Sequence, residues 1–383
     1  MIGPVALISY LTQIHFAYDA LSVLPDECAR LDIRRPLIVT DLGVRQAGLV
    51  DRLIASMNPS AEPIIFDETP ANPTEQAVRT AASQFTAKNC DGIIALGGGS
   101  SIDLAKGVSI AATHSGPLRT FAAIEQGMNK ITASVSPLIA IPTTAGTGSE
   151  VGRAAVVILD DGRKVGLISP HIIPKSAICD PELTIALPAR LTAGSGMDAI
   201  AHCMETFMSP AFNPPADGIA LDGLRRGWAH IERATFSPSD RDARLNMMSA
   251  SLQGALAFQK GLGCVHSLSH SLGGIDPRLH HGTLNAIFLP AVIEFNMAAA
   301  SVESEKCLPR MAEAMRISDP GKVPDAIREK NIKIGLPKGL SEVGVARGSF
   351  SEIIKRALLD HCHKTNPRLA TSEDYREILE ASM

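Results

Sequence analysis

The feature that most constrains the fold is a change of hydrophobic pattern near residue 187. Before this point, short apolar runs alternate with amphipathic stretches such as 44–57 and 74–89. Strands that alternate with helices predict a mostly parallel sheet, covered on both faces. A turn signal at Asp161-Gly162 predicts a hairpin within 154–169. The other apolar runs predict strands at 35–41, 62–68, 91–100 and 136–150, the last two running into glycine-rich turns.

From about residue 188 the apolar spacing is helical almost everywhere, as in 245–259, and the strand-like runs stop. A chain of 383 residues is also long for one hydrophobic core. We therefore predict two domains. They are an α/β domain with a Rossmann-like sheet over 1–186 and an all-helical domain over 187–383.

Composition excludes several classes of protein. The net charge is −4 and no lysine- or arginine-rich run occurs, which argues against nucleic-acid or anionic-membrane partners. The uncharged stretch 131–149 contains two prolines, so a membrane span is not expected there. No Lys or Arg precedes Arg30, and seven dispersed cysteines lack a C-x2-C pair. These features predict a cytoplasmic protein with reduced thiols and no signal peptide.

A glycine-rich segment follows the third predicted strand and opens a helix. Glycines let the backbone approach a phosphate, and a helix N-terminus supplies free N–H groups. A turn of purely structural use is the alternative, and the spacing is not that of the G-x-G-x-x-G fingerprint. The candidate residues are Gly97, Gly98, Gly99, Ser100 and Ser101.

A second loop, 143–150, follows the next strand and carries hydroxyl groups. Loops after neighbouring parallel strands lie at the same edge of a sheet, where ligands bind in open α/β folds. The pair of loops therefore predicts a nucleotide site more strongly than either loop does. The candidate hydroxyl groups are those of Thr143, Thr144, Thr147 and Ser149.

Asp41 ends the first strongly predicted strand. An acidic residue there can bind the ribose hydroxyls of NAD and repel the 2′-phosphate of NADP. A turn or helix-capping aspartate is the alternative, and Asn72-Pro73 by itself predicts only a turn.

Two helical motifs carry potential metal ligands. Asp198 and His202 lie one turn apart, as do His266 and His270, and the pair His280-His281 follows. A carboxylate with several imidazoles suits a divalent iron or zinc ion. For any histidine taken alone, a packing role in the core or on a helix face is expected rather than metal binding. Glu205, one turn beyond His202, is interpreted as an ordinary helix charge rather than as a partner of a ligand.

Taken together, these motifs resemble those of the iron-containing (group III) alcohol dehydrogenases, which belong to the dehydroquinate synthase-like superfamily. The resemblance covers nearly the whole chain and rests on an ordered set of segments. These are VTD (39–41), NP (72–73), GGGSSIDLAK (97–106), PTTAGTGSE (142–150), RK (163–164), DPELTIALP (180–188), GSGMDAIAHCMET (194–206), GLGCVHSLSHSLGG (261–274), HHGTLNAIFLP (280–290) and NPR (366–368).

The resemblance implies roles for individual residues. Metal-ligand positions fall on Asp198, His202, His266 and His281, and His270 falls near the nicotinamide and the substrate. Cofactor-side positions fall on Asp41, Asn72, the GGGS loop, Asp103, Thr143, Thr144, Ser149, Lys164 and Leu187.

Two departures from the family pattern bear on these roles. The early FGxG-like segment is here FAYDA (16–20), without its glycines. One extra residue precedes His281, so counting from His266 would select His280, whereas the histidine-glycine motif selects His281. Maleylacetate reductases resemble the same fold but lack the ligand set that is complete here.

The expected activity is reversible hydride transfer between a small alcohol, or a hydroxy acid, and NAD, with NADP as the alternative. The expected ion is Fe²⁺, with Zn²⁺ as the alternative. His270 would relay the released proton. Phe258, Leu262 and Ile275 are expected to line the substrate pocket, with Arg278 beside it. The competing interpretations are a dehydroquinate synthase-like lyase, a glycerol dehydrogenase-like polyol oxidase and a non-enzymatic sensor. A homodimer or larger homo-oligomer is expected from the family alone.

Overall fold

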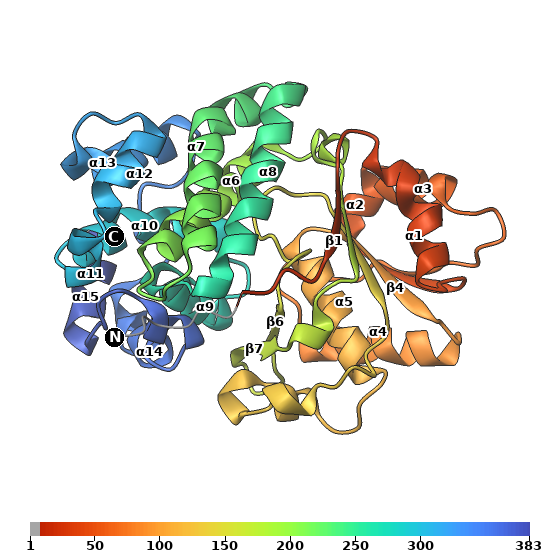
Figure 1. Ribbon diagram of the computed structural model, residues 1–383. Helices are drawn as coiled ribbons and strands as arrows, with labels where there is room; N and C mark the ends of the chain where they lie inside the picture. The colour runs from red at the N-terminus through yellow and green to blue at the C-terminus, as the bar shows by residue number, and fades with distance from the viewer. Residues whose placement is uncertain (1–7) are drawn as a thin grey trace, which may run out of the picture. The chain divides into compact units, whose positions relative to one another are not determined.

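The computed structural model describes residues 8–383, which divide into two compact units (Figure 1). The sheet unit comprises 11–144 and 148–187. The helical unit comprises 145–147 and 188–383 together with the described residues before Leu11. The helical unit has one hydrophobic core, and the sheet unit has two, one on each face of its sheet.

The sheet unit is built on six strands that pair in parallel throughout, in the order β1-β8-β5-β4-β2-β3. This confirms the predicted α/β fold. The strands are β1 (Gln13–Phe16), β2 (Pro36–Val39), β3 (Ile64–Phe66), β4 (Gly92–Gly97), β5 (Leu138–Pro142) and β8 (Ser176–Cys179).

Both faces of this sheet are covered, because successive side chains of a strand point to opposite sides. In β4, Ile93 and Ala95 pack into one core with α4 (Glu75–Ala87) and α5 (Gly99–Ala111). Ile94 and Leu96 pack into the other, with α1 (Leu24–Arg30) and α3 (Leu49–Ser56). The strands are apolar on both sides for this reason.

Two details of the sheet unit differ from expectation. The amphipathic stretch 44–57 forms two helices, α2 (Leu42–Gln46) and α3, because Gly48 adopts φ 75° and breaks the helical path. Strands β1 and β8 were not predicted from the sequence. Each has only four residues, and β1 mixes polar and apolar side chains, so neither gives a clear pattern.

The predicted hairpin is present as β6 (Ala154–Ile158) and β7 (Lys164–Ile168), which pair in antiparallel fashion around Gly162. It forms a separate two-stranded sheet. Helix α4 begins where Thr74 accepts a hydrogen bond from the backbone N–H of Ala77, a standard N-cap.

The helical unit contains no strand among its described residues, as predicted. Helices α6, α7 and α8 run alongside one another in Figure 1 and bury a common apolar face. Its helices are α6 (Ala189–Met208), α7 (Pro214–Phe236), α8 (Arg241–Ala257), α9 (Cys264–Ile275), α10 (His281–Asn296), α11 (Ala300–Ser304), α12 (Cys307–Met315), α13 (Val323–Lys333), α14 (Phe350–Ala357) and α15 (Ser372–Ala381). Over residues 8–383, none of the helices combines the length and the apolar character that crossing a bilayer requires.

Candidate active site

The centre of the candidate site is a buried face of α6. Asp198, His202 and Glu205 recur at intervals of four and three residues, which places them on one side of the helix. All three are at most 3% exposed. Buried groups of this kind need partners, and helices α9 and α10 supply them.

Three imidazole nitrogens surround one carboxylate oxygen in this cluster. The Nε2 atoms of His202, His266 and His281 lie 3.9, 3.8 and 3.7 Å from Oδ1 of Asp198. Ligand atoms in a tetrahedral site with bonds of about 2.1 Å are about 3.4 Å apart. Asp198, His202 and His266 could hold a divalent ion, since their ligand atoms all lie within 4.8 Å of one another. His281 is not a member of that group, although its Nε2 faces the same oxygen of Asp198, so it would have to move inward to become the fourth ligand.

Asn285 shows that the lone pairs of these atoms converge. Its amide Nδ2 donates to Oδ1 of Asp198 at 2.6 Å and lies 3.1 Å from Nε2 of both His266 and His281. The amide oxygen of Asn285 is buried and has no hydrogen-bond partner. The amide nitrogen of Asn285 thus lies close to three acceptor atoms, and a cation bound by those atoms would lie near the same point. Asn285 was not identified from the sequence, although it lies four residues after His281 and therefore on the same face of the helix.

The approach of α10 to α6 depends on Gly282. A Cβ atom at this position would lie 2.3 Å from the carbonyl oxygen of Gly194 and 3.1 Å from Cβ of Asp198. Any side chain here would push His281 away from Asp198. The glycine after the second histidine is thus required by close backbone contact.

Glu205 was wrongly interpreted as an ordinary helix charge. Its carboxylate lies 2.5 Å from Nδ1 of His266 and accepts the backbone N–H of Val265 at 2.8 Å. Burial, together with the neighbouring His202, lowers the pKa of His266 well below its usual range, so the ring is neutral. A neutral ring that donates from Nδ1 to Glu205 presents a free lone pair on Nε2, as a metal ligand must.

The two adjacent histidines have different surroundings. His281 is the first residue of α10, and its Nε2 faces Asp198. His280 is the N-cap residue, and its Nδ1 accepts the backbone N–H of Thr283 at 3.3 Å. The structure therefore brings His281, rather than His280, into the cluster around Asp198.

His270 lies beside the cluster on α9. Its ring stacks on that of His281 with centroids 5.3 Å apart, and its Nδ1 is 3.1 Å from Oδ2 of Asp360. Burial alone would raise the pKa of Asp360, but the neighbouring imidazoles of His270 and His361 and the hydrogen bonds to the carboxylate outweigh burial and hold this pKa well below its usual range. Asp360 was not identified from the sequence, because 90 residues separate it from His270.

The expected pocket-lining residues divide into two groups. The Phe258 ring meets His202 edge-on, with centroids 5.5 Å apart, and Leu262 and Ile275 are half-buried. The Arg278 side chain is 90% exposed and pairs with Asp276 at 2.7 Å. Arg278 is therefore already engaged at the surface.

The candidate cofactor residues of the sheet unit gather at the carboxyl ends of β2, β4 and β5. Gly97 ends β4, and α5 begins at Gly99, with Gly98 as its N-cap. A Cβ on Gly98 would lie 3.2 Å from the Thr144 side chain, so the two predicted loops adjoin. The backbone N–H of Thr143 donates to the carbonyl of Gly97 at 3.0 Å.

Asp41 and Ser100 are tied to the backbone at this edge. The Asp41 carboxylate caps α2 by accepting the N–H of Val44 at 3.0 Å, and it lies 3.4 Å from the Ser101 hydroxyl. Ser100 donates to the carbonyl of Ala71 at 2.6 Å. Asp41 therefore caps a helix, as one of its two expected roles requires, and it also contacts Ser101 of the glycine-rich segment.

Two further candidates, Asp103 and Ser149, belong to a buried network around Lys106. Ser149 donates to Asp103 at 2.5 Å, and the Lys106 ammonium donates to Ser149 at 2.8 Å and to the carbonyls of Gly152 and Ala154 at 2.9 and 2.8 Å. Lys106 is fully buried. This network holds the loop after β5 against α5.

The remaining candidates are spread over both units. The Lys164 ammonium donates to Oδ1 of Asn72 at 2.9 Å, which links two positions 92 residues apart in the sequence. Leu187 ends the sheet unit, whereas Thr147 belongs to the helical unit. In FAYDA, Asp19 adopts φ 62°, a backbone conformation that glycine takes more easily.

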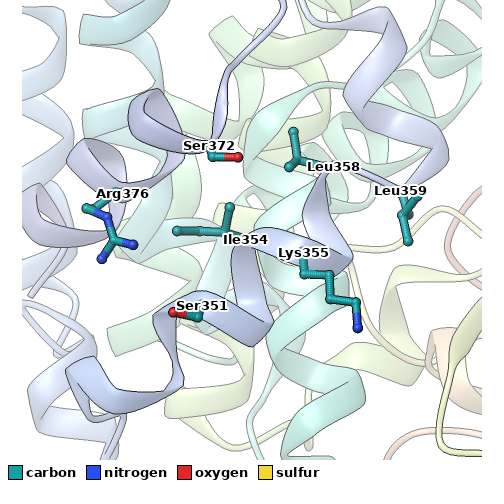
Figure 2. A pocket seen from close by; sticks show the side chains of 7 residues that line it. All are labelled: Ser351, Ile354, Lys355, Leu358, Leu359, Ser372 and Arg376. Atoms are coloured by element: carbon teal, nitrogen blue, oxygen red, sulfur yellow. The ribbon is translucent and has the colours of Figure 1, made fainter.

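A surface groove of about 490 Å³ lies between α14 and α15 (Figure 2). Its side chains are aliphatic, hydroxyl or cationic, and none is a carboxylate, imidazole or thiol. The chemistry of the cluster around Asp198 therefore makes that cluster the candidate active site. The groove is lined by Ser351, Ile354, Lys355, Leu358, Leu359, Ser372 and Arg376.

Comparison with known proteins identifies the family. Residues 12–181 match the family model described as iron-containing alcohol dehydrogenase, and 192–383 match its C-terminal counterpart. The chain is 60% identical to 4-hydroxybutyrate dehydrogenase of Cupriavidus necator, over 99% of this chain and all of that one. It is 35% identical to 1,3-propanediol dehydrogenase of Klebsiella pneumoniae, over 95% of both chains.

Solved structures agree with this assignment. The crystal structure of 1,3-propanediol oxidoreductase superimposes with a TM-score of 0.92 at 34% identity, covering 99% of this chain and 100% of that one. An archaeal alcohol dehydrogenase from a Red Sea brine pool gives 0.91 at 27% identity, over 100% and 99% of the two chains. The chain therefore belongs to the iron-containing alcohol dehydrogenase family and is a nicotinamide-dependent oxidoreductase of alcohols or hydroxy acids.

Proposed function

We propose that this enzyme oxidises 4-hydroxybutyrate, a hydroxy acid with a terminal alcohol, to the corresponding aldehyde acid with NAD. The observation that carries the proposal is the 60% identity to 4-hydroxybutyrate dehydrogenase of Cupriavidus necator over full length. Relatives that act on 1,3-propanediol or methanol are 35% identical or less. A small diol is the second candidate substrate, because the 1,3-propanediol dehydrogenase also matches over 95% of the chain.

We propose that Asp198, His202, His266 and His281 hold the metal ion, as Fe²⁺. Support comes from the three Nε2 atoms grouped around Oδ1 of Asp198 and from the amide of Asn285 at their point of convergence. When bound there, a divalent ion would act as a Lewis acid that lowers the pKa of the substrate hydroxyl.

The chain's own residues prepare this site. Glu205 accepts a hydrogen bond from Nδ1–H of His266 and so keeps the Nε2 lone pair turned to Asp198. Asp198, His202 and His266 are buried, which strengthens the electrostatic interactions among them, whereas the His281 side chain is 24% exposed. Phe258, edge-on to His202, covers one side with an apolar ring.

We propose that His270 accepts the proton that leaves the substrate hydroxyl. Its Nδ1 donates to Asp360, so its Nε2 carries a lone pair, and the carboxylate stabilises the ring when it becomes charged. The His361 side chain, 35% exposed and stacked on His270, lies between this pair and solvent. The proton therefore has a short route out of a buried site.

We propose that the sheet unit binds NAD. The backbone of Gly97–Ser101 and the N-terminus of α5 suit the pyrophosphate, and the hydroxyl groups of Thr143 and Thr144 stand beside them. Asp41 would bind the ribose hydroxyls and repel the 2′-phosphate of NADP. The remaining proposed cofactor residues are Asn72, Asp103, Thr147, Ser149, Lys164 and Leu187. The proposed location is the cytoplasm, which suits seven free cysteines.

The test is a substrate panel with purified protein, loaded with Fe²⁺ without oxygen and assayed by NADH absorbance. We expect kcat/KM for 4-hydroxybutyrate to exceed that for 1,3-propanediol and 1-butanol by at least about tenfold, the ratio that about 1.4 kcal/mol of preferential transition-state binding gives. A higher kcat/KM for the diol would replace the proposed substrate, and NADPH formation faster than NADH formation would overturn the cofactor assignment.

A further inference from the structure

A second group of potential metal ligands lies in the helical unit. It comprises His270, Asp360, His361 and Cys362, each of which offers one ligand atom within 4.8 Å of the others. His270 comes from α9, and the other three are consecutive residues at the start of the 3-10 helix η11 (His361–Thr365). None of the last three belongs to the ligand set proposed above.

One ligand atom of each residue in this group lies within 4.8 Å of the others, so shifts of the side chains would bring them to the separations of a tetrahedral zinc site. Nδ1 of His270 is 3.1 Å from Oδ2 of Asp360, and Nδ1 of His361 is 3.7 Å from the same oxygen. Sγ of Cys362 lies 3.4 Å from Nε2, the other nitrogen of the His361 ring, so this ring would turn to present a single nitrogen to the ion. Zinc bonds of about 2.0 Å to nitrogen or oxygen and 2.3 Å to sulfur place ligand atoms about 3.3 to 3.8 Å apart.

The local backbone brings the three consecutive side chains together. Oδ1 of Asp360 accepts the backbone N–H of Cys362 at 2.8 Å, which folds the chain back over the carboxylate. The other carboxylate oxygen, Oδ2, then lies near Nδ1 of both His270 and His361. Without this turn, three successive residues would point in different directions.

The donor chemistry differs from that of the cluster around Asp198. A thiolate, two imidazoles and one carboxylate form a borderline-soft set that suits Zn²⁺ better than hard cations. A thiolate and a carboxylate together neutralise a divalent cation, which favours binding in a buried place. Cys362 is 2% exposed, whereas the half-exposed His361 leaves a route from solvent.

We propose that His270, Asp360, His361 and Cys362 form a second metal site, selective for zinc and separate from the site around Asp198. On binding, the Cys362 thiol releases its proton to solvent and its sulfur bonds to the ion. If the proposed function is correct, an ion here also withdraws His270 from proton transfer and inhibits the enzyme.

Cobalt substitution tests the site directly, because thiolate ligation to Co²⁺ gives an intense charge-transfer band in the near ultraviolet. The cluster around Asp198 contains no sulfur, so it cannot produce this band. We expect the band in full-length wild-type protein titrated with Co²⁺, growing as a second equivalent binds. Its absence at saturating Co²⁺ would overturn the proposal.

Two variants and one control localise the band. Cys362→Ser should abolish it, and Cys28→Ser, which alters a half-buried thiol of the sheet unit, should leave it unchanged. His361→Ala should weaken zinc binding by more than about 100-fold in chelator competition, since loss of even an outer-shell partner costs 10 to 100-fold. Persistence of the band in Cys362→Ser would assign it to another cysteine and refute the site.

The activity assay separates this proposal from the proposed function. Zinc added to the Fe²⁺-loaded enzyme should inhibit the wild type at concentrations at least about tenfold below those that inhibit His361→Ala, because the variant binds zinc more weakly. Equal inhibition of both proteins would refute the inhibitory role. A protein that turns over none of the alcohols yet shows the cobalt band would contradict the dehydrogenase assignment and leave the second site standing.

Discussion

The two candidate sites, one in each unit, are assembled in different ways. At the sheet edge, the residues follow β2, β4 and β5, so parallel topology alone brings them together. In the helical unit, the cluster around Asp198 draws on α6, α9 and α10, whose contributing residues span 84 positions from Asp198 to His281. Sheet topology therefore specifies a site that tolerates local change, whereas the helical cluster depends on a few close contacts.

The largest effect should come from removing one imidazole of the helical cluster. His266→Ala eliminates a proposed ligand and leaves Glu205 without its partner, so iron should be lost. Loss of Lewis-acid assistance worth several kcal/mol predicts a fall in kcat/KM of at least about 1000-fold. NADH formation and iron content are the measurements.

NAD binding should survive this change, because the proposed cofactor residues lie largely in the other unit. His114→Ala, in the sheet unit, is the matched control and should keep both iron and turnover. Unchanged turnover in His266→Ala would refute the ligand assignment, and loss of NAD binding would refute the division of labour between the units.

The second largest effect should be on the free energy of unfolding, when Lys106 in the sheet unit is replaced. Burial lowers the pKa of Lys106 to about 8, so the ammonium is still charged at pH 7. Lys106→Ala would leave Asp103 and two carbonyls without their cation, which should destabilise folding by about 3 to 5 kcal/mol. Urea unfolding measures this value.

Exposed Lys88→Ala is the control and should change stability by less than about 0.5 kcal/mol. A loss below about 1 kcal/mol in Lys106→Ala would mean that the buried network does not hold the loop after β5. The sheet edge would then tolerate change even at Lys106.

The sequence predicted the elements of the sheet edge better than the contacts between helices, because strand patterns are local and helix packing is not. Strands β4 and β5 were predictable because their apolar runs end in glycine-rich loops, whereas β1 and β8 are four residues long and carry little pattern. Helical spacing identified Asp198 with His202. It could not show that Glu205 meets His266, because that contact depends on packing between helices.

Glu205→Gln tests that missed contact and should have an intermediate effect. The amide keeps the shape of the side chain but cannot act as a carboxylate acceptor for the His266 proton. Iron affinity should fall by about 10 to 100-fold, with turnover falling in parallel at limiting iron. Chelator competition followed by iron analysis measures the affinity.

Exposed Glu303→Gln on α11 is the control and should match the wild type. Wild-type iron affinity in Glu205→Gln would return Glu205 to the role of an ordinary helix charge. Partial recovery in Glu205→Asp would instead point to the charge as the important property.

The smallest effect should come from the sheet edge. Asp41→Asn removes the charge but preserves the N-cap of α2, because asparagine caps as well as aspartate does. Relief of a repulsion worth about 1 kcal/mol should raise kcat/KM for NADP roughly fivefold relative to NAD. Steady-state kinetics with both cofactors measure the ratio.

Asp51→Asn, on the exposed face of α3, should leave the ratio unchanged. An unaltered ratio in Asp41→Asn would show that Asp41 only caps a helix, which is the simpler of its two expected roles. The sheet edge would then select its cofactor through other residues.

The most direct test of the central claim is anomalous diffraction at the iron edge from crystals of the Fe²⁺-loaded protein. We predict a peak within about 2.0 to 2.3 Å of Oδ1 of Asp198 and of Nε2 of His202, His266 and His281. A peak coordinated by His280 instead of His281, or no iron peak at Asp198, would contradict the proposed metal site.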